Sequence, residues 1–196
     1  MFRDEDAANI FEELLREQKV IACMRRVEDL PEVLNHSKIK NIFILNCNIF
    51  ELKKIVTHAN NLGKKVFVHV DLVEGLGKDQ FGIKFLAKTI GVTGIITTKV
   101  QLIKAAKKEG LITVQRFFTV DSEAVKTGIS MAKVAKPDAI EVMPAFLPKY
   151  YLDEIISELK IPVIAGGLIR TEEEADHILA TGFRGISTSI RRLWNL

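Results

Sequence analysis

Two short segments near the C-terminal end of the chain carry residue types that suit phosphate binding. Gly166 and Gly167 follow one apolar run, and three hydroxyl residues, Ser187, Thr188 and Ser189, follow the next. Glycine lets backbone N–H groups approach an anion closely, and a helix expected from about residue 170 adds unpaired N–H donors at its N-terminus. Together the two segments predict a phosphate cradle, although a glycine pair also fits a simple turn between a strand and a helix.

Four charged residues follow or end other apolar runs. They are Asp71, Lys99, Arg116 and Glu141. If the runs are parallel strands of one barrel, these side chains share a mouth, where their charges and hydrogen bonds would suit a small phosphorylated polyol. Arg116 and Glu141 are also compatible with a buried ion pair that touches no ligand. Because His69 and Asp71 are two residues apart, we expect both to point to the same side of their strand.

The same charged residues are also compatible with an enzyme. An acid and a lysine across a mouth can transfer protons or form a Schiff base, so an enzyme acting on a phosphorylated triose or polyol is the alternative. The sequence contains no nucleophile elbow, Walker loop or GxGxxG motif. Cys23 and Cys47 form no CxxC pair and make no disulfide framework. We therefore predict no catalytic residues, no metal site and no cofactor.

Eight short apolar runs position these residues. They are expected to start near residues 20, 41, 65, 94, 112, 139, 162 and 185, and helical segments separate them. Runs that are apolar almost throughout are typical of parallel strands covered by helices on the outside. Eight such units predict a compact (β/α)8 TIM barrel. An open doubly wound sheet is the competing topology. Residues suited to phosphate binding follow the last two strands, and this favours the closed barrel.

The sequence also predicts how the helices begin and where the barrel starts. Residues 4–19 have helical spacing, so residues 1–19 are expected to form a leading helix that could cover the bottom of a barrel spanning 20–196. Asp121 is expected to cap one helix, and Thr171 with Glu174 fits a capping box at another. The whole chain is expected to be a single domain.

Length and composition limit the possible class of protein. The chain has 196 residues, of which 47% are hydrophobic and 27% charged, with a net charge of +3. These values are those of an ordinary globular protein. No apolar stretch is long enough to cross a bilayer, and the N-terminus lacks the apolar core of a signal peptide, so a cytoplasmic location without membrane contact is expected.

Five motifs in series resemble one family, and the resemblance covers nearly the whole chain from about Val20. The motifs read VHVDLVEG at 68–75, GIITTK at 94–99, QRFF at 115–118, IEVMP at 140–144 and IAGGLIRT at 164–171. The series resembles the glycerol uptake operon antiterminator regulatory proteins of bacteria. The resemblance implies a TIM-barrel-like protein that responds to glycerol 3-phosphate and binds an mRNA leader to prevent transcription termination. It also implies that the effector lies between the phosphate cradle and the charged mouth residues.

An RNA-binding surface is expected where basic side chains cluster on one helix face. Lys104, Lys107 and Lys108 fall on one face of a predicted helix and are the candidate RNA contacts, although such a cluster is also typical of a solvated helix face. A homodimer would lengthen the basic surface. A phosphate-ligand sensor without an RNA partner therefore remains a further alternative.

Overall fold

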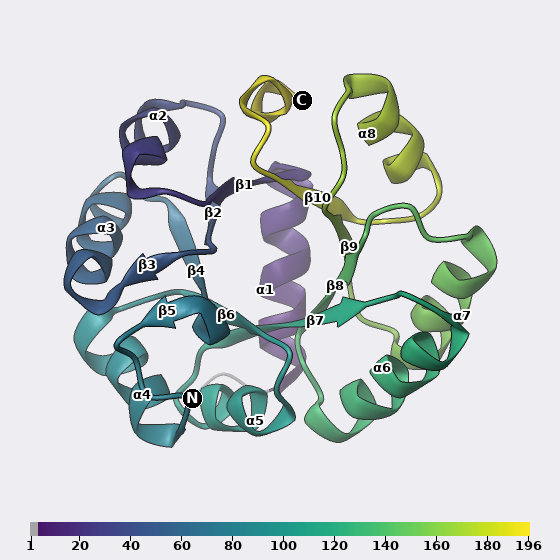
Figure 1. Ribbon diagram of the computed structural model, residues 1–196, viewed down its shortest axis with the longest axis horizontal. Helices are drawn as coiled ribbons and strands as arrows, with labels where there is room; N and C mark the ends of the chain where they lie inside the picture. The colour runs from purple at the N-terminus through teal and green to yellow at the C-terminus, as the bar shows by residue number, and fades with distance from the viewer. Residues whose placement is uncertain (1–3) are drawn as a thin grey trace.

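The computed structural model describes residues 4–196, and its centre is a closed barrel of eight parallel strands (Figure 1). Around the barrel the strands follow one another in chain order, and the last pairs with the first. This confirms the predicted TIM barrel over the open sheet. The barrel strands are β1 (Val20–Met24), β2 (Asn41–Ile44), β4 (Lys65–His69), β6 (Gly94–Thr97), β7 (Ile112–Phe118), β8 (Ala139–Met143), β9 (Val163–Gly166) and β10 (Gly185–Thr188).

Helices follow the strands and form the outer ring. Two helical segments are irregular, because the one after β1 divides into two short helices and the one before β6 ends as a π-helix. The helical elements are α1 (Asp4–Glu17), η1 (Val27–Asp29), α2 (Leu30–Asn35), α3 (Ile49–Asn61), η2 (Val70–Leu72), α4 (Gln80–Phe85), η3 (Leu86–Ile90), α5 (Val100–Lys108), α6 (Ser122–Ala135), α7 (Lys149–Leu159), α8 (Glu172–Ala180) and η4 (Arg191–Asn195).

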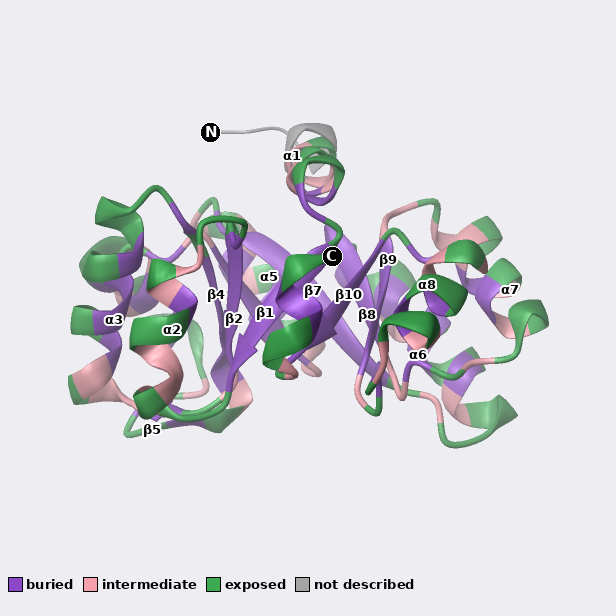
Figure 2. Cartoon of the chain, turned by 90° about the horizontal axis from the view of Figure 1, so that it is seen from above, coloured by how far each residue is buried: buried purple, intermediate pink, exposed green. Residues whose placement is uncertain are grey.

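The leading helix α1 covers the amino-terminal end of the barrel, as predicted (Figure 2). Phe11 and Leu15 enter the apolar cluster inside the barrel, and the ring of Phe11 meets the edge of Phe67 with 5.6 Å between ring centroids. The side chain of Asn41 donates to the carbonyl of Leu14 at 3.1 Å. The opposite, carboxyl end of the barrel therefore remains as the open mouth. Residues 1–3 of the predicted leading segment lie outside the described residues.

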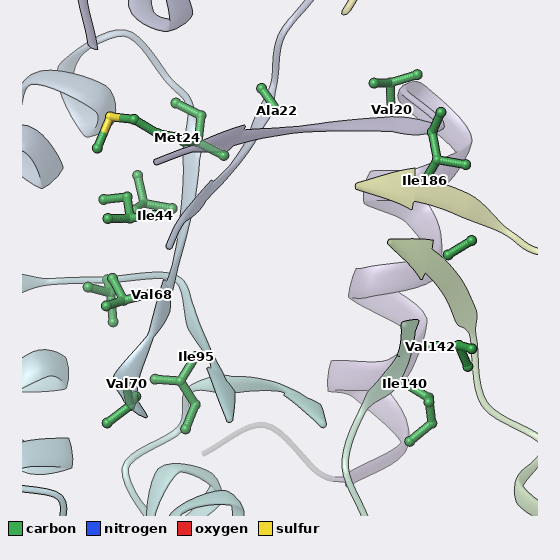
Figure 3. Close-up of a cluster of buried hydrophobic side chains, with 14 of the residues drawn as sticks. Val20, Ala22, Met24, Ile44, Val68, Val70, Ile95, Ile140, Val142 and Ile186 are labelled. Carbon is green, nitrogen blue, oxygen red and sulfur yellow. The ribbon is translucent and has the colours of Figure 1, made fainter. Parts of the chain in front are cut away.

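Apolar side chains on the outward face of the strands hold the ring of helices in place. Val20, Met24, Ile44, Ile140 and Ile186 point away from the barrel interior into this outer layer, where they are buried (Figure 3). Since the inward face carries a second apolar cluster, both faces of each strand are buried. This is why the strands appear in the sequence as continuous rather than alternating apolar runs.

A two-stranded parallel sheet adds structure at one side of the mouth that the sequence did not predict. It pairs β3 (Cys47–Asn48) with β5 (Val73–Glu74). Asn48 also caps α3 by accepting from the backbone of Phe50 and Glu51, each at 3.0 Å. The loops after β2 and β4 are therefore tied to each other on this side.

Candidate functional site

A polar cavity of about 220 Å³ opens at the mouth of the barrel. Its walls come from β1, β7, β8 and β10 and from the segments that follow β1, β2, β9 and β10, so it lies on the side where the last strands close against the first. Most of the lining residues are polar, or belong to the two loops predicted to hold phosphate. The lining residues are Cys23, Arg25, Leu45, Arg116, Glu141, Met143, Gly167, Leu168, Ile169, Arg170, Ser187, Thr188, Ser189 and Ile190.

A buried ion pair forms the floor of the cavity. Arg116 and Glu141 lie directly opposite each other on β7 and β8, and the Arg116 Nε donates to a Glu141 oxygen at 2.6 Å. The Ser187 hydroxyl donates to the other carboxylate oxygen at 2.5 Å. The Glu141 side chain is completely buried, so both of its oxygens are satisfied by protein groups. The predicted ion pair and the predicted mouth location are thus both present.

Arg116 keeps most of its donors after pairing with Glu141. A guanidinium has five N–H groups, and Nε supplies one of them. In the part of the chain that the structure describes, the bond from Nε to Glu141 is the one hydrogen bond this side chain makes. Because Arg116 lines the cavity, its two terminal amino groups can donate to an occupant. A planar, permanently charged fork of this kind suits an oxyanion or a set of hydroxyls.

The C-terminal segment fixes the outer rim of the cavity. Trp194 is buried and donates from its ring nitrogen to the carbonyl of Thr188 at 3.0 Å. Arg192 donates to the carbonyl of Arg170 at 2.5 Å, which links this segment to the loop after β9. The two loops predicted to form a phosphate cradle are thus connected to each other, although they belong to different β/α units.

The N-terminus of α8 plays a different part from the one predicted. Thr171 caps the helix by accepting from the Glu174 backbone at 3.2 Å, and Glu174 accepts in return from the backbone of Thr171 at 3.2 Å and of Arg170 at 2.6 Å. This confirms the capping box. The first turn also carries three glutamates, and their charge opposes a bound anion. Donors for a phosphate must therefore come from the loop before the helix.

The two glycines of the predicted cradle have separate structural roles. Gly167 lines the cavity and has φ of 78°, a conformation that favours glycine. Gly166 is buried at the end of β9, outside the cavity lining. A Cβ added to Gly166 would lie 2.6 Å from the Ser187 hydroxyl and 2.8 Å from a Glu141 oxygen. Gly166 therefore makes room for the ion pair on the floor.

Asp71 and Lys99 lie at the mouth but outside the cavity lining. Asp71 accepts from the Thr97 hydroxyl at 2.8 Å and from the Thr98 backbone at 3.0 Å, and Lys99 Nζ lies 3.6 Å from its other oxygen. The prediction that His69 and Asp71 point to the same side of one strand is wrong, because the two residues do not lie on the same strand. β4 ends at His69, and Asp71 lies in the 3-10 turn η2, where strand alternation no longer applies.

His69 is a buried imidazole at the mouth end of the barrel interior. It is 4% exposed, and neither ring nitrogen has a hydrogen-bond partner among the described residues. Burial, with the nearby Arg116 cation adding to it, lowers the pKa of His69 from 6.5 to about 4. The side chain is therefore neutral in the folded protein at physiological pH.

The lowered pKa of His69 predicts how the stability of the folded protein depends on pH in the acid range. As pH falls, the histidine is protonated in the unfolded chain before it is protonated in the folded protein. The free energy of unfolding therefore decreases between pH 6.5 and about 4, by about 3 kcal/mol in total. Below about pH 4 this contribution is constant. A His69→Gln variant lacks the titrating group, so subtracting its urea-unfolding free energies from those of the wild type at each pH isolates the effect. Parallel pH profiles for the two proteins would contradict it.

The two cysteines are free and buried. Burial, with the Glu141 carboxylate adding to it, raises the pKa of the Cys23 thiol to about 12. Burial likewise raises the pKa of Cys47 to about 11. Cys23 therefore lines the cavity as a neutral thiol and lacks the thiolate character that nucleophilic cysteines need. Residues 4–196 contain no cluster of three or more histidine, cysteine or acidic side chains placed to hold a metal ion.

The predicted RNA-contact lysines lie on α5, along the outside of the barrel. Lys104 and Lys108 are exposed. Lys107 differs from them, because its ammonium lies 3.1 Å from the nearly inaccessible carboxylate of Asp138 and donates to the carbonyl of Lys136 at 2.7 Å. The structure thus gives Lys107 a role in holding α5 against the base of β8.

Sequence reasoning left two cavity arginines out of the predicted site. Arg25 follows β1 and Arg170 follows the glycine pair, and both are exposed side chains that line the cavity. Arg25 occupies the position after a strand that in this fold faces the mouth, and Arg170 falls within the loop predicted to hold phosphate. The sequence could therefore predict that both arginines lie near the mouth. Which loop residues face into the cavity depends on the conformation of each loop.

The fold and the cavity define this chain as a (β/α)8 barrel with an arginine-rich polar site at the carboxyl ends of its strands. Residues 20–194 match the family described as glycerol-3-phosphate responsive antiterminator, and the chain belongs to that family. This confirms the resemblance seen in the motifs. No helix among residues 4–196 has both the length and the apolar character to span a membrane.

Individual relatives agree with this membership. The crystal structure of a glycerol uptake operon antiterminator regulatory protein from Listeria monocytogenes is 35% identical, with a TM-score of 0.85 and coverage of 91% of this chain and 95% of that one. An antiterminator-related protein from Thermotoga maritima is 37% identical, with a TM-score of 0.80 and coverage of 90% and 98%. The uncharacterised protein YgcP of Escherichia coli strain K12 is 35% identical over 183 residues, which is 93% of this chain and 95% of YgcP.

More distant solved structures share the barrel alone. Several are aldolases, with identities of 12–18% and TM-scores of 0.62–0.69. At this level of identity the likeness concerns the fold, since one barrel architecture supports many unrelated functions.

Proposed function

We propose that this protein binds glycerol 3-phosphate in the mouth cavity and, in response, contacts an mRNA leader so as to promote antitermination of glycerol-uptake genes. The observation that carries the proposal is the cavity itself, in which two linked loops face the free donors of Arg116. Membership of the responsive antiterminator family supports the choice of effector.

The parts of the cavity suit different parts of the proposed ligand. The loop of Gly167 and the hydroxyls of Thr188 and Ser189 would hold the phosphate, with Arg25 and Arg170 supplying positive charge at the rim. Arg116 and Ser187 on the floor would meet the polyol hydroxyls. The cavity is also below the roughly 300–1,000 Å³ of pockets that take drug-sized molecules, which suits a three-carbon phosphate.

Ligand-dependent thermal unfolding tests the effector. At a concentration of glycerol 3-phosphate about 100 times its dissociation constant, we expect stabilisation of about 2.7 kcal/mol, or a rise in Tm of roughly 5–10 °C for a chain of this size. Glycerol at the same concentration should leave Tm unchanged, because it lacks the phosphate. An equal response to both compounds would remove the phosphate site from the proposal.

The enzyme alternative rests on Lys99, whose surroundings are unfavourable for it. A Schiff-base lysine is activated by a desolvated pocket or a second cation. Lys99 is 43% exposed, pairs with Asp71 and lies outside the cavity lining. Incubation of the protein with glycerol 3-phosphate, followed by NMR, should show the ligand unchanged. Turnover would favour the enzyme.

The RNA partner and the cellular location complete the proposal. An antiterminator acts on nascent transcripts, so the protein would work in the cytoplasm, alone or as a homodimer. Because its phosphate contacts would release counterions, binding to a leader transcript should weaken steeply with added salt. Glycerol 3-phosphate can raise RNA affinity only if it binds the RNA-competent state more tightly.

A further inference from the structure

A groove at the closed end of the barrel carries unpaired positive charge. Two hollows of about 480 and 520 Å³ lie beside α1, and they share Ala8, Asn9, Lys160 and Ile161 in their walls. They therefore form one continuous groove between α1 and the C-terminal ends of α6 and α7, which we call the basal groove. Figure 2 shows α1 standing at this end of the barrel, away from the mouth.

The basal groove has more cations than anions. Six basic and three acidic side chains line it. Each acid has a basic partner: Asp138 pairs with Lys107, Glu158 with Lys133, and Glu12 with Arg184. The other three cations, Arg16, Lys136 and Lys160, are exposed and make no ion pair with a described residue. The surplus is spread over three separate segments of the chain, which suits a polyanion better than a single small anion.

Two of these cations occupy strained backbone positions. Lys136 and Lys160 end α6 and α7 with φ of 53° and 54°. Helices usually place glycine or asparagine in this conformation, since a Cβ is unfavourable there, and Gly91 does so after η3. Of the three non-glycine residues at positive φ within residues 4–196, two are these lysines. Two strained positions in one groove favour the hypothesis that these side chains make a functional contact.

The type of contact follows from the lining. No aromatic side chain of the described residues lines either hollow, so stacking on bases is absent. Lysine and arginine side chains without aromatic neighbours recognise the phosphate backbone, which gives affinity and position but little sequence preference. The groove is therefore suited to the backbone of a structured RNA.

The basal groove and the mouth cavity lie at the two ends of one strand pair. On β7 and β8, Arg116 and Glu141 face the mouth. At the other end, the Thr113 backbone and hydroxyl donate to Asp138 at 2.8 and 2.7 Å, and Asp138 pairs with the groove residue Lys107. Both sites are thus built on the same rigid element.

We infer that the basal groove is the RNA-binding surface of this protein, with Arg16, Lys136 and Lys160 as its phosphate contacts. This rests on the RNA-binding part of the proposed function. It places the main contacts beside α1 rather than on the exposed lysines of α5.

Fluorescence anisotropy with a labelled RNA hairpin tests the inference. The groove variant combines Arg16→Gln, Lys136→Gly and Lys160→Gly. Its two glycines relieve strain, so its Tm should equal or exceed that of the wild type. We expect its RNA affinity to fall about tenfold or more and the slope of log K against log salt to decrease by about 2–3. A control variant with the same loss of charge on α3 and α4, Lys53→Gln, Lys54→Gln and Lys84→Gln, should stay within about twofold of the wild type.

Two results would overturn the inference, and they have different consequences. If the wild type binds the hairpin and the groove variant binds equally well, the groove is wrong and the proposed RNA function stands. If the wild type binds neither the hairpin nor a glycerol-operon leader transcript, the RNA function fails and the groove with it. The Tm response to glycerol 3-phosphate is measured separately, so the effector proposal is judged on its own result.

Discussion

An Arg116→Met variant is expected to lose about 3–5 kcal/mol of folding free energy, because removing one partner of a buried pair leaves the other charge uncompensated. The remaining charge is Glu141, which is completely buried and accepts from Arg116 at 2.6 Å. Methionine keeps most of the side-chain length, so no large cavity forms. The loss of stability therefore measures the effect of leaving the Glu141 charge unpaired. Chemical denaturation at neutral pH measures it.

The double variant Arg116→Met/Glu141→Met is the matched control. With both charges gone, no buried ion remains unpaired, and apolar replacements of such pairs are often neutral or stabilising. Most of the lost stability should return, to within about 1–2 kcal/mol of the wild type. Neither the single nor the double variant should respond to glycerol 3-phosphate, because both lack the donors of Arg116. A double variant as unstable as the single one would show that the ion pair does not explain the loss.

Gly166→Ala is expected to weaken both the folding of the protein and its response to the ligand. The new Cβ would approach the Ser187 hydroxyl and a Glu141 oxygen to 2.6 and 2.8 Å. One of them must move, which breaks the 2.5 Å hydrogen bond between them. A hydrogen bond to a charged group contributes about 1.5–3 kcal/mol, so we expect a loss of about 2–3 kcal/mol and about 100-fold weaker ligand binding. Denaturation and calorimetric titration measure the two effects.

Gly63→Ala serves as the control for losing a glycine. Gly63 has φ of 70°, but a Cβ there would meet nothing within 4 Å. The change should cost about 1–2 kcal/mol from backbone strain and leave the ligand response unchanged. If Gly166→Ala binds glycerol 3-phosphate as tightly as the wild type does, the arrangement of Ser187 and Glu141 is not part of the ligand site.

The positions of the barrel strands could be predicted because their signal is local. Seven of the eight barrel strands begin at the expected residues, and β9 begins one residue later than expected. The N-terminal caps of two helices could also be predicted from the sequence. Asp121 accepts from the Ala124 backbone at 2.8 Å, and Thr171 forms its capping box with Glu174. Each of these features depends on side chains within a few residues, so no knowledge of the distant chain was needed.

The membership of the site was only partly predictable. Arg116, Glu141, Gly167 and the hydroxyls of residues 187–189 line the cavity as strand-end positions suggested. Asp71 and Lys99 have the same kind of position but face each other beyond it, because the chain turns into η2 directly after His69. Strand ends define a mouth, whereas the conformation of each loop decides which side chains enter a particular cavity.

By itself, the sequence determined that eight parallel strands would alternate with helices, where most of them would begin, and which family the chain belongs to. Only the tertiary structure decided that Ser187 reaches the carboxylate of Glu141 and that Arg192 joins the two rim loops. It also decided that Arg16, Lys136 and Lys160 share one groove. The physical reason is range: apolar periodicity and capping act over a few residues, while these contacts join residues brought together only when the barrel closes.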